Sequence, residues 1–220
     1  MEGRALTVTA DMVKELRERT QAPMMDCKRA LDETGGDMDA AVRLLRERGK
    51  AQAAKKAGRS ASEGAVVSYI HGGGRIGVLV EVNCETDFVA RNADFQAFAR
   101  EIAMQVAASA PRYVRRDEVP EDEIEAERQI LRAQAEGSGK PAAVVEKMVE
   151  GRLGKFFERV CLLEQPYIRD PQRHVEELVT DLVGRIGENI QVRRFVRWEL
   201  GEAVERDSAP AEEPPEAIRV

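Results

Sequence analysis

The chain has 220 residues, of which 43% are hydrophobic and 34% charged, and its formal net charge is −6. No apolar run is long enough to cross a bilayer and the N-terminus lacks the segments of a signal peptide, so we expect a cytoplasmic protein without a membrane partner. The acidic balance disfavours direct binding to nucleic acid, which requires a net basic face.

Residues 1–50 are predicted to form a module of three short helices, with turns at residues 20–23 and 34–36. The apolar positions at helical spacing are Met12, Val13 and Leu16, then Met24, Cys27, Ala30 and Leu31, and then Ala40, Ala41, Leu44 and Leu45. So small a core is marginal alone and often serves as a docking module. Met24 and Met25 have two interpretations, core filling or an adaptable binding surface, and we expect one of them to be buried and the other exposed.

Residues 51–63 are predicted to be a linker. The stretch from Lys50 to Ser62 is rich in alanine and basic residues and lacks bulky apolar side chains. Such a composition favours a partly helical connection that lets the N-terminal module move relative to the rest of the chain.

After the linker the apolar pattern changes to the period of two that is typical of strands. Residues 65–70 and 75–83 both alternate, and they predict a β-hairpin with Ile76, Val78, Val80 and Val82 on one face. Gly72, Gly74 and Gly77 match the GxGxxG dinucleotide fingerprint. That motif requires glycines that open a helix, whereas these open a second strand, so we assign them to a hairpin turn.

Residues 64–200 are predicted to form a core in which helices pack on a three-stranded antiparallel sheet. Phe95, Phe98, Ile102 and Val106 indicate a helix, and a loosely packed charged helix is expected over residues 121–136. Two apolar helices should come next, one through Val149 and one from Leu153, and then a helix that Pro171 begins and Gly187 ends. Residues 190–200 predict a third strand with Ile190, Val192, Val196, Trp198 and Leu200 on one face. The acidic, proline-rich residues 201–220 are expected to be disordered.

Few residues offer catalytic or metal chemistry. The three cysteines, Cys27, Cys84 and Cys161, are widely spaced and are interpreted as small hydrophobic residues. Neither His71 nor His174 has a second ligand at metal spacing. GxSxG, HExxH and GxxxxGKS motifs are absent from the sequence. We therefore expect a protein that is not an enzyme and that needs no cofactor or metal.

The stretch NCETDFVARN, residues 83–92, joins a strand to a helix and places Phe88 beside Asp87. In one interpretation Thr86 or Asp87 caps the helix while Phe88 packs inward beside Phe95. In the other, a tight turn presents Phe88 as a wedge for a pocket on a partner. The residue pattern alone favours the first interpretation.

Residues 82–92, VNCETDFVARN, resemble the signature of the elongation factor Ts family, whose members are exchange factors for elongation factor Tu. Four further stretches match in order: VKELRERTQAPMMDCKRAL, AKKA, LLEQPYI and IGENIQVRRF. The resemblance runs from about residue 11 to residue 201 and departs at residues 21–23, where Gln-Ala-Pro replaces Gly-Ala-Gly. The chain is similar to the short members with a single core unit, not to the long members with a duplicated core and a coiled-coil insertion.

The resemblance implies an α+β fold with a ubiquitin-associated three-helix module at the N-terminus, and it implies guanine nucleotide exchange on elongation factor Tu. The module would dock on Tu through a surface that includes Val13, Leu16, Met24 and Met25. The residues Thr86, Asp87, Phe88 and Val89 would enter Tu near its Mg²⁺, displace the ion and promote GDP release. Short members associate through their sheets, which implies a homodimer. The alternative from another class is a ubiquitin-associated-like scaffold without exchange activity.

Overall fold

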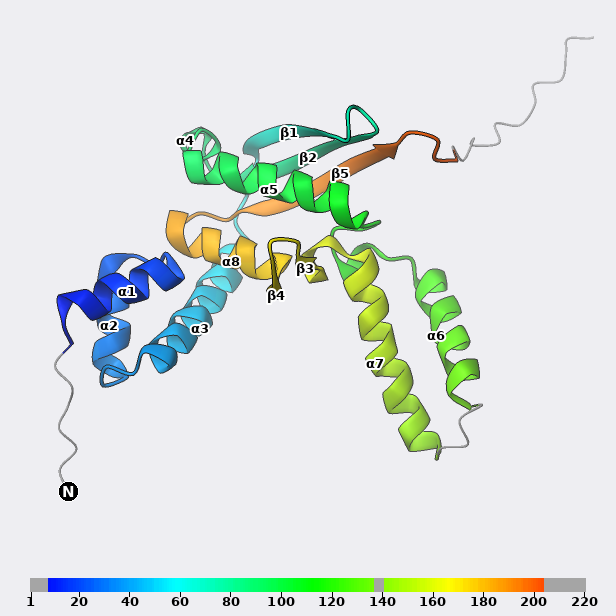
Figure 1. Ribbon diagram of the computed structural model, residues 1–220, viewed down its shortest axis with the longest axis horizontal. Helices are drawn as coiled ribbons and strands as arrows, with labels where there is room; N and C mark the ends of the chain where they lie inside the picture. Colours follow the sequence, from blue (N-terminus) through cyan, green and yellow to red (C-terminus); the bar gives the residue numbers. More distant parts are fainter. Residues whose placement is uncertain (1–7, 137–140, 204–220) are drawn as a thin grey trace, which may run out of the picture.

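The computed structural model describes residues 8–136 and 141–203. They form an α+β fold, as predicted, with three N-terminal helices followed by a three-stranded antiparallel sheet packed with helices. The bundle and a pair of long helices extend from the same side of the central sheet and its helices (Figure 1). From residue 204 onward, the tail predicted to be disordered lies outside the described residues.

The N-terminal bundle consists of α1 (Ala10–Thr20), α2 (Met24–Glu33) and α3 (Met38–Lys56). Thr9 caps α1 by accepting the Met12 N–H at 3.3 Å, and Asp37 caps α3 by accepting the Ala40 N–H at 2.9 Å. The buried core of the bundle contains Val13, Leu16, Cys27, Ala30, Leu31 and Ala41.

α3 continues through residues 51–56, which the composition assigns to the linker. The alanines and lysines of this stretch are strong helix formers and include no helix breaker. Ala53 packs against the core of the sheet, and α3 contacts the last helix of the chain, α8 (Val175–Ile186). A continuous helix therefore connects the bundle to the core.

The central sheet has the order β1-β2-β5, with β1 (Glu63–His71), β2 (Ile76–Cys84) and β5 (Gln191–Glu199) all antiparallel to their neighbours. The turn between β1 and β2 contains Gly72, Gly73 and Gly74 at φ values of 61°, 66° and 92°, which confirms the hairpin assignment. α5 (Ala93–Ser109) packs on one face of the sheet, where Phe95 and Ile102 are fully buried with Val80 and Val82.

The prediction that the apolar residues of β5 share one face is wrong. Val82 pairs with Val192 while Glu81 pairs with Arg194, so Arg193 is an extra residue in a β-bulge. The bulge reverses the alternation, since one residue shifts every later side chain of the strand to the opposite face. Val192 is consequently buried, whereas Val196 and Trp198 are exposed on the outer face of the sheet.

The two apolar helices predicted around residue 150 form one helix, α7 (Ala142–Val160). Gly151 and Gly154 lie within this helix and do not break it. α7 packs against α6 (Glu121–Glu136), and we call this pair the arm. α6 is packed more firmly than predicted. Two of its residues, Leu131 and Ala135, are buried in a separate core with Val149, Leu153 and Phe156.

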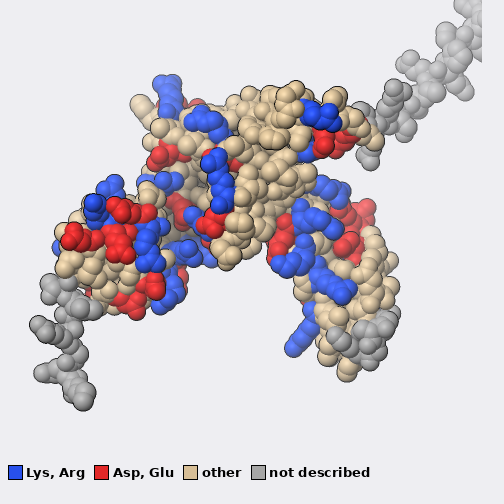
Figure 2. Space-filling model, viewed as in Figure 1, with Lys and Arg blue, Asp and Glu red and all other residues tan. Residues whose placement is uncertain are grey.

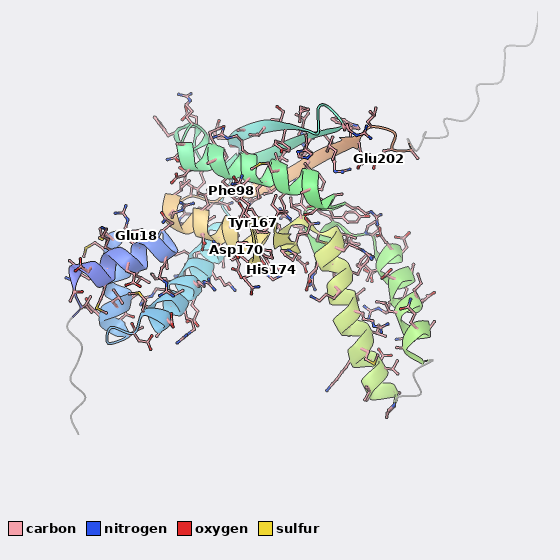
Figure 3. The ribbon with its side chains drawn as sticks, viewed as in Figure 1. Glu18, Phe98, Tyr167, Asp170, His174 and Glu202 are labelled. Carbon is pink, nitrogen blue, oxygen red and sulfur yellow. The ribbon has the colours of Figure 1, made fainter. Side chains whose placement is uncertain are left out.

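The prediction that Pro171 begins a helix is also wrong. Pro171 lies in β4 (Asp170–His174), which pairs with β3 (Pro166–Tyr167), and α8 begins only at Val175. The fixed φ of proline suits an exposed short strand as well as a first helical turn. Tyr167 lies below α5 in Figure 3, and its hydroxyl donates to Glu101 at 2.7 Å, which ties this hairpin to α5. Gly187, at a φ of 87°, ends α8 as predicted.

Candidate protein-interaction site

Residues 83–92 form a strand-to-helix junction built around one helical turn, α4 (Asp87–Ala90). Thr86 is extended, and its hydroxyl oxygen accepts the Val89 N–H at 3.4 Å. Asn92 then caps α5 by accepting the Asp94 N–H at 2.8 Å. Thr86 is therefore the N-cap of α4, in agreement with the local sequence pattern, and α5 has a cap of its own.

Phe88 is 80% exposed, so its side chain does not pack inward. Phe95, at 0% exposure, is buried as predicted, but Phe88 does not pack beside it as the first interpretation expects. The other residues of the turn explain this orientation, since Ala90 is buried and Val89 packs against the core of the sheet. Asp87 forms an ion pair with Arg91 at 2.9 Å, which leaves Phe88 as the large apolar group that this turn exposes.

Two residues that sequence reasoning did not assign to the site hold the junction from behind. Glu188 and Asn189 follow α8 and approach Glu85 and Thr86 across more than a hundred residues of sequence. Both belong to IGENIQVRRF, a stretch that marked the family resemblance and gave the only sequence signal for their position. Cys84, just before the junction, is buried, and burial with the nearby Glu188 charge raises the pKa of its thiol to about 11.

The expected docking residues lie on the bundle, away from the junction. Met24 is 45% exposed and Met25 is 60% exposed, so the expectation that one of them is buried is wrong. Both occupy the first turn of α2, where Cys27, Ala30 and Leu31 provide the buried face. Val13 and Leu16 are buried inside the bundle. The structure therefore groups Thr86 to Val89 at one place and the two methionines at another.

Basic and acidic side chains are interspersed over the bundle and along the arm (Figure 2). A cleft of about 740 Å³ between the bundle and the core is lined by side chains of both signs, among them Asp181, which pairs with Arg173. Burial raises the pKa of Asp181, although Arg173 opposes the shift. Within residues 8–136 and 141–203, no cluster of three or more metal-ligating side chains occurs. In the same ranges, no helix is both long and apolar enough to span a bilayer.

Comparison with known proteins identifies the family. A family model described as Elongation factor TS matches residues 6–202. The Elongation factor Ts of Carboxydothermus hydrogenoformans is 66% identical over 197 residues, which are 90% of this chain and 91% of that protein. The Elongation factor Ts of Desulforamulus reducens is 62% identical over 199 residues, or 90% of this chain and 92% of that protein. These matches show that the chain, with its helical bundle, three-stranded sheet and exposed Phe88, belongs to the elongation factor Ts family of translation elongation factors.

Proposed function

We propose that this protein is a guanine nucleotide exchange factor for elongation factor Tu and that Phe88 is its wedge. The observation that carries the proposal is the 80% exposure of Phe88 on a one-turn helix whose neighbouring residues are held by the core. An exposed aromatic residue on a well-held turn suits the centre of an interface, where such side chains carry much of the binding free energy.

Exchange of this kind is a consequence of linkage. A protein that binds nucleotide-free Tu more tightly than nucleotide-bound Tu must weaken nucleotide binding by the same factor. We propose that Asp87 and Phe88, with Thr86 and Val89 beside them, enter Tu near its Mg²⁺ and displace the ion. The ion neutralises the phosphates of GDP, so its loss releases the nucleotide. The proposed action makes and breaks no covalent bond, so the protein would not be an enzyme, and it requires no cofactor on this chain.

A second contact is proposed for the bundle. Met24 and Met25 expose flexible, polarisable side chains that adapt well to a partner surface. Val13 and Leu16 are buried in the core of the bundle, so we propose that they stabilise the bundle instead of touching the partner. On the face that Figure 2 shows, basic and acidic side chains are interspersed and form no continuous basic stripe of the kind that binds nucleic acid, and we propose a protein partner in the cytoplasm.

The wedge is tested by measuring release of a fluorescent GDP analogue from Tu in a stopped-flow instrument. Phe88→Ala should slow the release at saturating exchange factor by about a hundredfold, since aromatic anchors contribute about 2–4 kcal/mol at interfaces. Ile130→Ala is the matched control, because Ile130 is also a large exposed apolar residue but lies on the arm. Equal release rates for Phe88→Ala and the wild type would exclude the wedge.

The docking role is tested with Met24→Ser/Met25→Ser, measured as the dissociation constant for Tu by calorimetry. Point substitutions are preferable to deletion of the bundle, because α3 packs against α8 and its removal would expose the core. We expect weaker binding with little change in the release rate at saturation. A dissociation constant equal to that of the wild type would remove the methionines from the interface. If the protein is a scaffold instead, Tu captured with it will retain its nucleotide.

We also propose a homodimer through the outer face of the sheet. Val66, Ile70, Leu79, Val196 and Trp198 are exposed there, and the strand register sets Ile70, Gly77 and Trp198 in one row across the sheet. A contiguous exposed apolar face of this kind marks an interaction site. Light scattering should report a dimer for the wild type and a monomer for Trp198→Lys, and a monomeric wild type at micromolar concentration would refute the assignment.

A further inference from the structure

The loop after α8 holds the junction through one carboxylate that accepts three hydrogen bonds. Glu188 accepts the backbone N–H groups of Glu85 and Thr86, each at 3.0 Å, and the hydroxyl of Thr86 at 2.7 Å. Glu85 and Thr86 come after the last paired residue of β2, so the Glu188 carboxylate supplies the acceptor that a neighbouring strand would otherwise provide. Hydrogen bonds to an ionised acceptor are about twice as strong as those between neutral groups.

The direction of these bonds fixes the orientation of the Thr86 side chain. A hydroxyl has a single proton, and Thr86 donates that proton to Glu188. The lone pairs of the oxygen are then free to accept the Val89 N–H at 3.4 Å, which is the bond that caps α4. The carboxylate of Glu188 thus determines, through the Thr86 hydroxyl, how the turn that carries Phe88 begins.

A second set of contacts runs in the opposite direction. The Glu85 carboxylate accepts the Asn189 N–H at 2.6 Å and pairs with Arg59 at 3.5 Å. Asn189 is buried, and its side-chain amide donates to the backbone oxygen of Arg59 at 2.8 Å. We call Glu85, Thr86, Glu188 and Asn189 the clasp. Each side of the clasp uses a carboxylate to bind the backbone of the other side.

We propose that Glu188 is the positioning residue of the Phe88 turn, acting through Thr86 so that Phe88 is presented in one orientation. This inference rests on the proposed exchange function and adds to its machinery a residue that acts through the Thr86 hydroxyl. A wedge loses effect when its orientation varies, because the partner must then order it on binding. Glu188 holds Phe88 in one orientation before the partner binds.

The sharpest variant is Glu188→Gln, which keeps the size of the side chain and removes its charge. A carboxamide offers one oxygen, so an NH₂ group must face either the two backbone N–H groups or the Thr86 hydroxyl. We expect the maximum rate of GDP release from Tu to fall by about tenfold, with a smaller change in the concentration that gives half of it. The amide protons of Glu85 and Thr86 should exchange with solvent about tenfold faster, which a loss of overall stability would not confine to these two residues.

Glu176→Gln is the matched control, because it removes the same charge from an exposed position on the first turn of α8. It should match the wild type in GDP release and in the exchange of both amide protons. If Glu188→Gln fails to fold, Thr86→Val takes its place, since it removes the hydroxyl without changing the shape, and Thr86→Ser should restore the rate. The double variant Glu188→Gln/Thr86→Val should be no slower than the slower single variant, because Glu188 is proposed to act on the turn through the Thr86 hydroxyl that the second substitution removes.

The outcomes separate this inference from the proposed function. If the wild type itself does not accelerate GDP release from Tu, the exchange function fails and the role of Glu188 fails with it. If the wild type accelerates release and folded Glu188→Gln matches it in maximum rate, only the positioning role is refuted. Additive losses in the double variant would also refute it, since the two groups would then act independently.

Discussion

Phe88 and Phe95 lie close together in the sequence but should differ sharply in what their removal costs. Fully burying a phenylalanine side chain contributes about 1.5–3 kcal/mol, so the one-fifth of Phe88 that is covered contributes about 0.3–0.6 kcal/mol. Phe95 is fully buried against the sheet, and Phe95→Ala should lower the free energy of unfolding by about 3–5 kcal/mol because it also leaves a cavity.

Urea titration followed by circular dichroism measures both values under the same conditions. Phe88→Ala should shift the free energy of unfolding by less than about 1 kcal/mol while it removes most of the proposed exchange activity. Phe95→Ala is the converse variant, with low stability and an intact wedge side chain. A loss of more than about 2 kcal/mol in Phe88→Ala would mean that Phe88 packs inward and is not an exposed wedge.

Four other substitutions have defined outcomes. Gly64 has a φ of 149°, and a Cβ there would lie 2.1 Å from the backbone oxygen of Val82, so Gly64→Ala should cost about 2 kcal/mol or more in urea titration. Gly58→Ala, with nothing within 4 Å of its Cβ, should change the same value by less than about 0.5 kcal/mol. Burial raises the pKa of Cys84 from 9.0 to about 11, so the native state binds this proton more tightly than the unfolded state. The contribution of the protonated Cys84 thiol to the free energy of unfolding is present below pH 9 and is lost as the pH rises towards 11. Cys84→Ala should therefore flatten the fall of the melting temperature between these two pH values. Leu153→Ala should destabilise the arm by about 2–5 kcal/mol, seen as faster amide exchange along α7, and unchanged exchange would mean that the arm has no core of its own.

The elements whose apolar pattern is regular are predictable from the sequence. The period of two in residues 76–82 identifies the buried face of β2, and the glycine turn differs from a nucleotide loop in leading into a strand instead of a helix. The prediction for β5 fails at the bulge, because one extra residue reverses the faces without changing the composition of the strand. Pro171 is misassigned because proline is compatible with both a short exposed strand and a first helical turn.

The candidate site is predictable only in part. Local rules narrow the cap to Thr86 or Asp87, and the structure shows that it is Thr86, which accepts the N–H three positions later. Local rules cannot decide whether Phe88 is buried, because the answer depends on Ala90 and Val89 being the residues of this turn that pack against the core. Glu188 lies 102 residues from Thr86, and periodicity and propensity carry no information over such a separation.

The continuous course of α3 affects how a partner could bind the two proposed contact surfaces, the methionine surface and Phe88, at the same time. A flexible tether would let the methionine surface and Phe88 bind almost any spacing of sites at a moderate effective concentration. A helix that enters the core and packs against α8 instead fixes the spacing, so the two surfaces reinforce each other only on a partner of matching shape. A partner that changes the distance between its two sites by a few ångströms would lose that reinforcement. The affinity for the partner would then depend on the partner's conformation, because α3 holds the two surfaces at one spacing.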